Sequence, residues 1–179
     1  MVDTLVQKMT AAEYFELPET NQPTQLIDGE LIVAASPIPY HQELSGNLFV
    51  GLKSVVPDGK VYFSPLDLYL DDENVPQPDL IWVAADGRCT ITPKRFEGPP
   101  ELIIEILSPG TACVDKIRKF HLYERHAVTE YWIVNAEEGF VEVFQLADGK
   151  YVLHGVFDEE SPLNSPRLSA TIDLKTIFT

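Results

Sequence analysis

Two nearly continuous apolar runs constrain the fold of this chain more than any other feature. Residues 78–84 read PDLIWVA, and residues 101–108 read ELIIEILS. A strand that is covered on both faces of a sheet has this composition, whereas a strand with one solvated face alternates apolar and polar residues. The two runs therefore predict the centre of a β-sheet that other elements cover on both faces.

The segments around these runs predict two helices and two hairpins. Apolar stripes over residues 40–56 and 114–127 have helical spacing, and the second stripe leads directly into the strand-like segment 130–135, which suggests a right-handed strand-helix-strand crossover. Asp28-Gly29 and the triplet 147–149 each separate two extended segments, as hairpin turns do. We expect an α/β (α+β) fold with a central mixed sheet flanked by helices and with N-terminal and C-terminal β-hairpins.

Length and composition predict one globular domain over residues 1–179. The chain is 45% hydrophobic and 10% aromatic, which is ordinary for such a domain. No apolar run approaches the roughly 20 residues that span a bilayer, and the N-terminal stretch lacks a signal-peptide core. We therefore expect a cytoplasmic protein without a membrane partner. Cys89 and Cys113 lack the spacing of a metal site or a disulfide framework.

The charge of the chain bears on whether it can bind a nucleic acid. The sequence has 13 Lys and Arg against 28 Asp and Glu, a formal net charge of −15, and such a surface repels a polyanion unless basic residues gather locally. A local basic ridge is possible, but solvated charges on loops and on one helix face are the simpler interpretation. The basic residues that gather are Lys94, Arg95, Lys116, Arg118, Lys119 and Arg125.

An acidic residue stands in each of the two apolar runs. Glu105 needs a partner because an unpaired buried carboxylate is costly, and Asp79 begins the other run. If the two strands are neighbours, these carboxylates converge with the carbonyl of Ile106. Such hard oxygen ligands suit Mg²⁺ or Mn²⁺, which also keep waters and bind substrate phosphate.

The predicted helix after these runs adds a candidate base. Asp115, Lys119 and Tyr123 are spaced by four residues, so they lie along one helix face. A lysine above a metal site could orient or deprotonate the attacking water, or stabilise charge on the phosphate. The simpler interpretation is an i,i+4 ion pair of about 0.2–0.5 kcal/mol and a tyrosine in the core.

The order of these residues carries a family resemblance. Pro78-Asp79 followed by Glu105-Ile106-Leu107 resembles the PD-(D/E)XK nuclease superfamily, in which two acids and a lysine line one edge of a mixed sheet, although Leu107 stands at the usual lysine position. The longer stretch from Gln77 to Trp132 resembles the Uma-type putative restriction endonucleases, in which the lysine lies on the following helix. Lys119 matches that position, and Lys116 is the alternative one turn earlier.

The resemblance implies a Mg²⁺-dependent (or Mn²⁺-dependent) endonuclease that acts on DNA, and we expect a homodimer. It extends to the segment 26–31, Ser36-Pro37 and His41. Glu30 is either an additional acid at the metal or an edge-strand acid, and His41 contacts phosphate or substrate unless it is a capping or surface residue. The remaining roles that the resemblance implies are metal binding by Asp79, Glu105 and the Ile106 carbonyl, action on the nucleophile or phosphate by Lys119, and positioning of Lys119 by Asp115 and Tyr123.

Two other functions stay open at the level of the sequence. A nuclease fold without catalysis, acting as a binding or regulatory module, would account for Leu107 and for the acidic net charge. A hydrolase could instead use Asp79 and Glu105 as an acid/base pair on a small substrate or a sugar. Metal binding that depends on both acids separates the nuclease from these alternatives.

Overall fold

A mixed six-stranded sheet forms the centre of the protein. The computed structural model describes residues 8–18, 22–34, 36–107 and 112–179, and their side chains except those of residues 112–115. The strands lie in the order β11-β10-β9-β8-β5-β3, with β8 and β9 parallel and every other neighbouring pair antiparallel. Their bounds are β3 (Lys60–Phe63), β5 (Leu80–Val83), β8 (Leu102–Leu107), β9 (Glu130–Asn135), β10 (Phe140–Ala147) and β11 (Lys150–Asp158).

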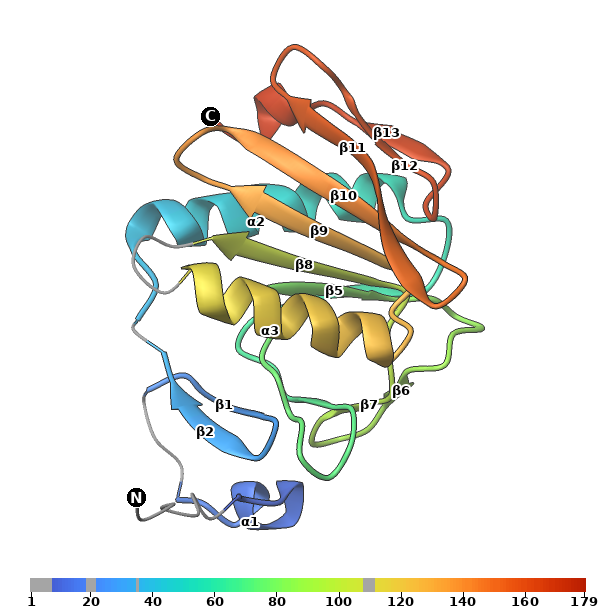
Figure 1. Cartoon of the computed structure of the whole chain (residues 1–179). Helices are drawn as coiled ribbons and strands as arrows, with labels where there is room; N and C mark the ends of the chain where they lie inside the picture. The colour runs from blue at the N-terminus through green and yellow to red at the C-terminus, as the bar shows by residue number, and fades with distance from the viewer. Residues whose placement is uncertain (1–7, 19–21, 35, 108–111) are drawn as a thin grey trace.

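A long helix covers each face of this sheet (Figure 1). Helix α2 (Pro39–Val55) packs through its leucines on Leu102, Ile104 and Ile106 of β8. Helix α3 (Ala112–Arg125) packs on the opposite face, where Ile103 lies. Successive residues of a strand point to opposite faces, so β8 must be apolar at nearly every position. The prediction of a sheet covered on both faces is confirmed.

The predicted hairpins are present. Strands β1 (Thr24–Ile27) and β2 (Glu30–Val33) flank Asp28 and Gly29, whose positive φ values of 52° and 75° suit a two-residue turn. Strands β10 and β11 form the C-terminal hairpin. Among the described residues, no helix is both long and apolar enough to cross a bilayer.

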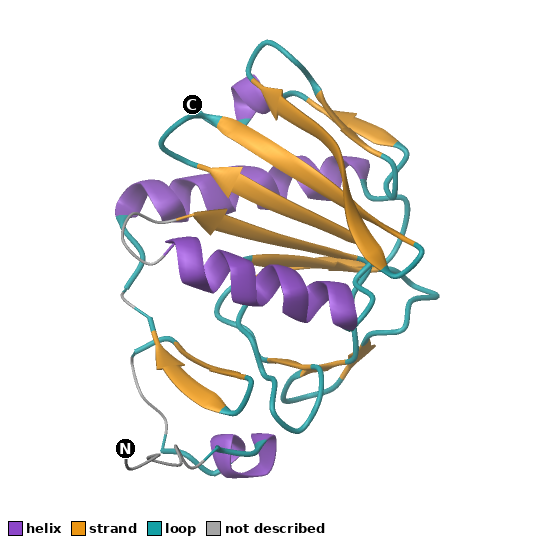
Figure 2. Cartoon of the chain, viewed as in Figure 1, coloured by secondary structure: helices purple, strands orange, loops and turns teal. Residues whose placement is uncertain are grey.

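Smaller elements surround this core (Figure 2). The short strand around Leu68 belongs to a separate three-stranded sheet and not to the central one. A second C-terminal hairpin follows β11 and was not expected from the sequence. The bounds of the remaining elements are α1 (Ala11–Phe15), β4 (Leu68–Tyr69), β6 (Thr90–Ile91), β7 (Phe96–Glu97), β12 (Leu163–Ser165), β13 (Ala170–Ile172) and the 3-10 helix η1 (Leu174–Thr176).

Candidate active site

The pairing of β5 with β8 brings the two candidate acids together. Leu80 pairs with Ile104 in an antiparallel register, and one further residue along that register places Asp79 opposite Glu105. The Oδ2 atom of Asp79 accepts a hydrogen bond of 2.7 Å from the backbone N–H of Ile106. Asp79 is therefore held at the end of β5 by the backbone of the neighbouring strand, and the condition that the two strands are neighbours is met.

Glu105 is buried between the sheet and α3. Its Oε2 lies 2.9 Å from Nζ of Lys119, and its Oε1 accepts a hydrogen bond of 2.7 Å from the hydroxyl of Tyr123. Lys119 is 6% exposed and Tyr123 is fully buried. The four-residue spacing thus places an ammonium and a phenol side by side over one carboxylate, and Tyr123 contacts Glu105 itself.

The surroundings of Glu105 change its acidity. Burial raises the pKa of Glu105 to about 7, because the charged form loses its hydration. The positive charge of Lys119 opposes this increase of the pKa, and the negative charge of Asp79 adds to it. A carboxyl group whose pKa is perturbed by burial and by specific charged partners is typical of a functional site.

His41 also lies at this site, on the first turn of α2. Its Nε2 is 3.3 Å from Oδ1 of Asp79, so the two oxygens of that carboxylate face a helix and a strand. The pKa of His41 is raised, first by hydrogen bonding to Asp79 and further by the charges of Asp79 and Glu105 and the backbone of Ile106, whereas burial lowers it. His41 is therefore neither a helix cap nor a surface residue, the two simpler interpretations of its position in the sequence.

The structure places the other predicted residues elsewhere. Glu30 forms an ion pair of 2.9 Å with Arg118. Lys116 binds Glu142 of β10 at 2.7 Å. The side chain of Asp115 lies outside the described residues.

Lys116 and Lys119 reach different strands although both lie on α3. Glu105 pairs with Ile133 of β9, and Ile133 pairs with Glu142 of β10, so the two carboxylates stand two strands apart. Two strand spacings amount to about 10 Å. Lys116 is thus engaged at a different position of the sheet and does not provide the alternative lysine proposed from the sequence.

The basic residues of α3 do not form an unpaired ridge. Besides Lys116 and Lys119, Arg118 pairs with Glu30, and Arg125 pairs with Asp28 of the β1–β2 turn. The gathering of positive charge seen in the sequence is therefore balanced by carboxylates brought from other strands. The pairs of Arg118 and Arg125 connect the N-terminal hairpin to α3, and their side chains remain partly exposed to solvent.

Two further buried acids have a different environment. Glu130 is fully buried and accepts hydrogen bonds from the indole of Trp132, the hydroxyl of Ser165 and the backbone of Arg167. Glu101 accepts hydrogen bonds from the backbone N–H groups of Ala84 and Arg88. Both carboxylates bind donors that fix nearby loops, and we assign them a structural role.

The oxygen donors at the site fit a hard divalent cation. Among the described residues, no three His, Cys, Asp or Glu side chains converge closely enough to form a complete cage for a metal ion. Mg²⁺ does not need such a cage, because it is usually held by one or two carboxylates together with waters and substrate phosphates. Asp79 and Glu105 are two neighbouring carboxylates that could bind an ion in this way.

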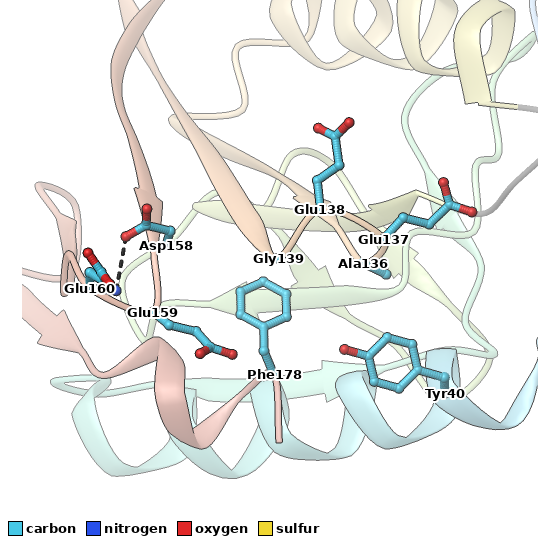
Figure 3. Close-up of a pocket in the computed structure, with 9 residues that line it drawn as sticks. All are labelled: Tyr40, Ala136, Glu137, Glu138, Gly139, Asp158, Glu159, Glu160 and Phe178. Carbon is cyan, nitrogen blue, oxygen red and sulfur yellow. Dashed lines mark hydrogen bonds between the residues drawn. The ribbon is translucent and has the colours of Figure 1, made fainter.

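An acidic hollow of about 410 Å³ lies at the same edge of the sheet. Tyr40, the neighbour of His41, and Phe178 form part of its wall (Figure 3). It also lies next to the end of β9, where Asn135 pairs with Leu107 of β8. Its acidic residues are Glu137, Glu138, Asp158, Glu159 and Glu160. These carboxylates make the hollow unfavourable for an anion.

The mixed sheet between two helices, with two acids at one edge and a lysine above them, defines a nuclease-like fold of the restriction-endonuclease class. The chain belongs to the Uma2 family, described as "Putative restriction endonuclease", whose model matches residues 11–175. The family resemblance seen in the sequence is thereby confirmed.

Two individual proteins are similar to this chain over most of its length. The chain is 27% identical over 169 residues to sll1609 of Synechocystis sp., described as an uncharacterized protein, and the match spans 91% of this chain and 96% of the relative. The crystal structure of a putative nuclease belonging to DUF820 from Anabaena variabilis superposes with a TM-score of 0.78 at 21% identity, covering 95% of this chain and 97% of that one. At this identity the structural likeness establishes the fold.

Proposed function

We propose that this protein is a Mg²⁺- or Mn²⁺-dependent endonuclease that hydrolyses phosphodiester bonds in DNA. The observation that carries the proposal is the convergence of Asp79, Glu105 and Lys119 from two adjacent strands and one helix, with Lys119 2.9 Å from Glu105. The family description supports a nuclease.

Each residue has a role that follows from its position. Asp79, Glu105 and the Ile106 carbonyl would hold the cation, which when bound lowers the pKa of water and neutralises charge on the phosphate. The ammonium of Lys119 would orient the attacking water or stabilise the charge on the phosphate. Tyr123 holds Glu105 through its hydroxyl and so fixes the carboxylate relative to α3.

The charge distribution predicts how DNA binds. Because the described cations of α3 are in ion pairs with carboxylates, few of them can neutralise phosphates without first giving up a partner. The slope of log K against log salt grows with the number of phosphates that a protein neutralises. We therefore expect weak binding of DNA in the absence of a divalent cation, with a shallow dependence on salt.

Cleavage assays on matched variants test the proposal. Plasmid and single-stranded DNA are incubated with Mg²⁺ or Mn²⁺ and with wild type, Asp79→Asn, Glu105→Gln, Lys119→Met or Lys116→Met. The first three substitutions are expected to lower the rate at least about 100-fold, the loss typical for an electrostatic group at a reacting centre. Lys116→Met, one turn away on the same helix, is expected to cut like wild type, and thermal melting of each variant checks folding.

The outcome separates the functions that the sequence left open. Equal cutting by all variants would mean that the activity comes from a contaminant and that the site assignment is wrong. If calorimetry shows that Mg²⁺ and Mn²⁺ do not bind in a manner that depends on Asp79 and Glu105, the fold serves as a binding module. Leu107 at the usual lysine position favours that second candidate.

A further inference from the structure

We propose that two copies of this protein form a homodimer through the outer edge of β11, which pairs antiparallel with β11 of the second copy across a twofold axis. The pairing would join two six-stranded sheets into one continuous sheet. This inference goes beyond the proposed function, because it depends neither on the cation nor on the cleavage of DNA.

Strand β11 is the outermost strand of the central sheet, beside β10 (Figure 1). An edge strand exposes unpaired backbone N–H and C=O groups, and proteins usually protect such an edge with charged residues, prolines or a very short strand. Strand β11 has nine residues, contains no proline, and has no Lys, Arg, Asp or Glu between Lys150 and Asp158. Its edge is therefore suited to pairing with another strand.

The apolar side chains of β11 remain exposed in the single chain. Val152 is 54% exposed, Leu153 48% and Val156 53%. Among the described residues, only β10 forms hydrogen bonds with the backbone of residues 152–157, whereas the N–H of Tyr151 also donates to Glu124 of α3. A further strand would therefore pair with the middle of β11, where both the backbone and the apolar side chains are available.

A bulge in β11 places Leu153 and Val156 on one face of the sheet. Leu153 pairs with Phe144 of β10 and Val156 pairs with Glu142, and the register shifts between these two pairs. Because Phe144 and Glu142 are two residues apart, they point to the same face, and so do their partners on β11. An antiparallel second copy with its Val156 opposite Leu153 would bring these apolar side chains into contact on that face.

The same register matches the rest of the strand with itself. It places Val152 opposite Phe157 of the second copy, and these two residues also share a face, because their partners on β10 are four residues apart. It places Lys150 opposite Glu159, so opposite charges meet at both ends of the interface. A parallel pairing in register would place like charges side by side. A twofold interface requires this self-complementarity, because each contact occurs twice.

Sedimentation equilibrium of the full chain over a range of concentrations measures the dimer. Leu153→Lys and Val156→Lys each place a charge against an apolar side chain of the second copy, and the symmetry repeats the defect. We therefore expect each substitution to raise the dissociation constant of the dimer at least about tenfold. Phe63→Lys is the matched control, because Phe63 is 52% exposed on β3, at the opposite edge of the sheet. This control should leave the dimer unchanged, and thermal melting verifies the fold of each variant.

Disulfide trapping tests the register. Opposed residues of an antiparallel pair have Cα atoms about 4.5–5.5 Å apart, which lies within the range of about 4.4–6.8 Å that a disulfide spans. An oxidised mixture of Leu153→Cys and Val156→Cys chains should therefore give more cross-linked dimer than either variant alone. A mixture of Leu153→Cys and Phe63→Cys chains is the control for random cross-linking, and wild type treated in the same way accounts for Cys89 and Cys113.

Each result decides one question. A dimer that both β11 substitutions weaken, and that cross-links between residues 153 and 156, supports the proposal. A wild-type protein that stays monomeric at every concentration overturns it, whether or not β11 pairs with a strand of a different protein. A dimer that Leu153→Lys and Val156→Lys leave intact, or that Phe63→Lys weakens equally, overturns the interface. A dimer that the β11 substitutions weaken but that gives no such cross-link overturns the register.

Discussion

Replacing Lys119 by methionine should destabilise the protein far more than replacing an exposed lysine. Methionine has a similar length, so the change removes the ammonium from Glu105 with little change in volume. The two side chains are only 8% and 11% exposed. Removing one partner of a buried ion pair costs about 3–5 kcal/mol because the other charge stays buried without compensation. Loss of a surface pair costs about 0–1 kcal/mol.

The destabilisation should depend on pH. Lys119 lowers the pKa of Glu105, which is nevertheless raised to about 7 by burial, so the pKa rises further when the ammonium is removed. An acid with a raised native pKa stabilises the fold most below its unfolded pKa, and this contribution is lost as the pH rises through the native pKa. The loss of stability in Lys119→Met should therefore be small near pH 5 and reach about 2 kcal/mol at pH 8.5, because each pH unit above a wild-type pKa of about 7 adds about 1.4 kcal/mol. The full cost of about 3–5 kcal/mol is expected only at higher pH.

Urea unfolding of the metal-free protein measures this effect. The transition can be followed by the fluorescence of Trp82 and Trp132, both fully buried. Lys116→Met is the matched control, because its ion pair with Glu142 is partly exposed. If the free energy of unfolding of Lys119→Met is less than about 1 kcal/mol below that of wild type at pH 8.5, Lys119 does not compensate a buried charge. The same conclusion follows if this difference does not change between pH 5 and pH 8.5.

Two further substitutions test the structural role assigned to Glu130 and Glu101. Glu130→Gln keeps the size of the side chain but turns an amide N–H₂ group toward hydrogen-bond donors. We therefore expect the free energy of unfolding in urea to fall by about 2–4 kcal/mol, with no change in Mn²⁺ affinity. Weakened Mn²⁺ binding would contradict the structural role. Gly87→Ala would bring Cβ into a clash with the Oε2 atom of Glu101. Overpacking of this kind costs about 1–3 kcal/mol, so we expect a lower melting temperature. An unchanged melting temperature would show that the Glu101 side chain can move aside.

Much of the secondary structure was predictable because its signals are local. The apolar run around Glu105 reads as a doubly covered strand, and the stripe of α3 has helical spacing whatever lies against it. The Asp28-Gly29 turn depends on the backbone freedom of two adjacent residues. The segment around Leu68 was harder to place, because a short extended segment can join any sheet whose edge it reaches.

The candidate site was predictable only in part. The sequence indicated Asp79, Glu105 and Lys119 through their spacing and the family resemblance, and the structure brings these residues together. The sequence could not show that Glu130 accepts hydrogen bonds from another segment, nor that His41 contacts Asp79. These contacts join residues far apart in the chain.

The sequence by itself determined the two long helices, the main strands of the central sheet, the two predicted hairpin turns and the candidate site residues, because each depends on neighbours within a few positions. Only the tertiary structure decided what those residues do. The register of β5 against β8 places Asp79 opposite Glu105. The position of α3 on the sheet pairs Lys119 with Glu105 and Lys116 with Glu142. Burial and pairing, which separate a candidate metal ligand from a structural acid, arise from packing between distant segments.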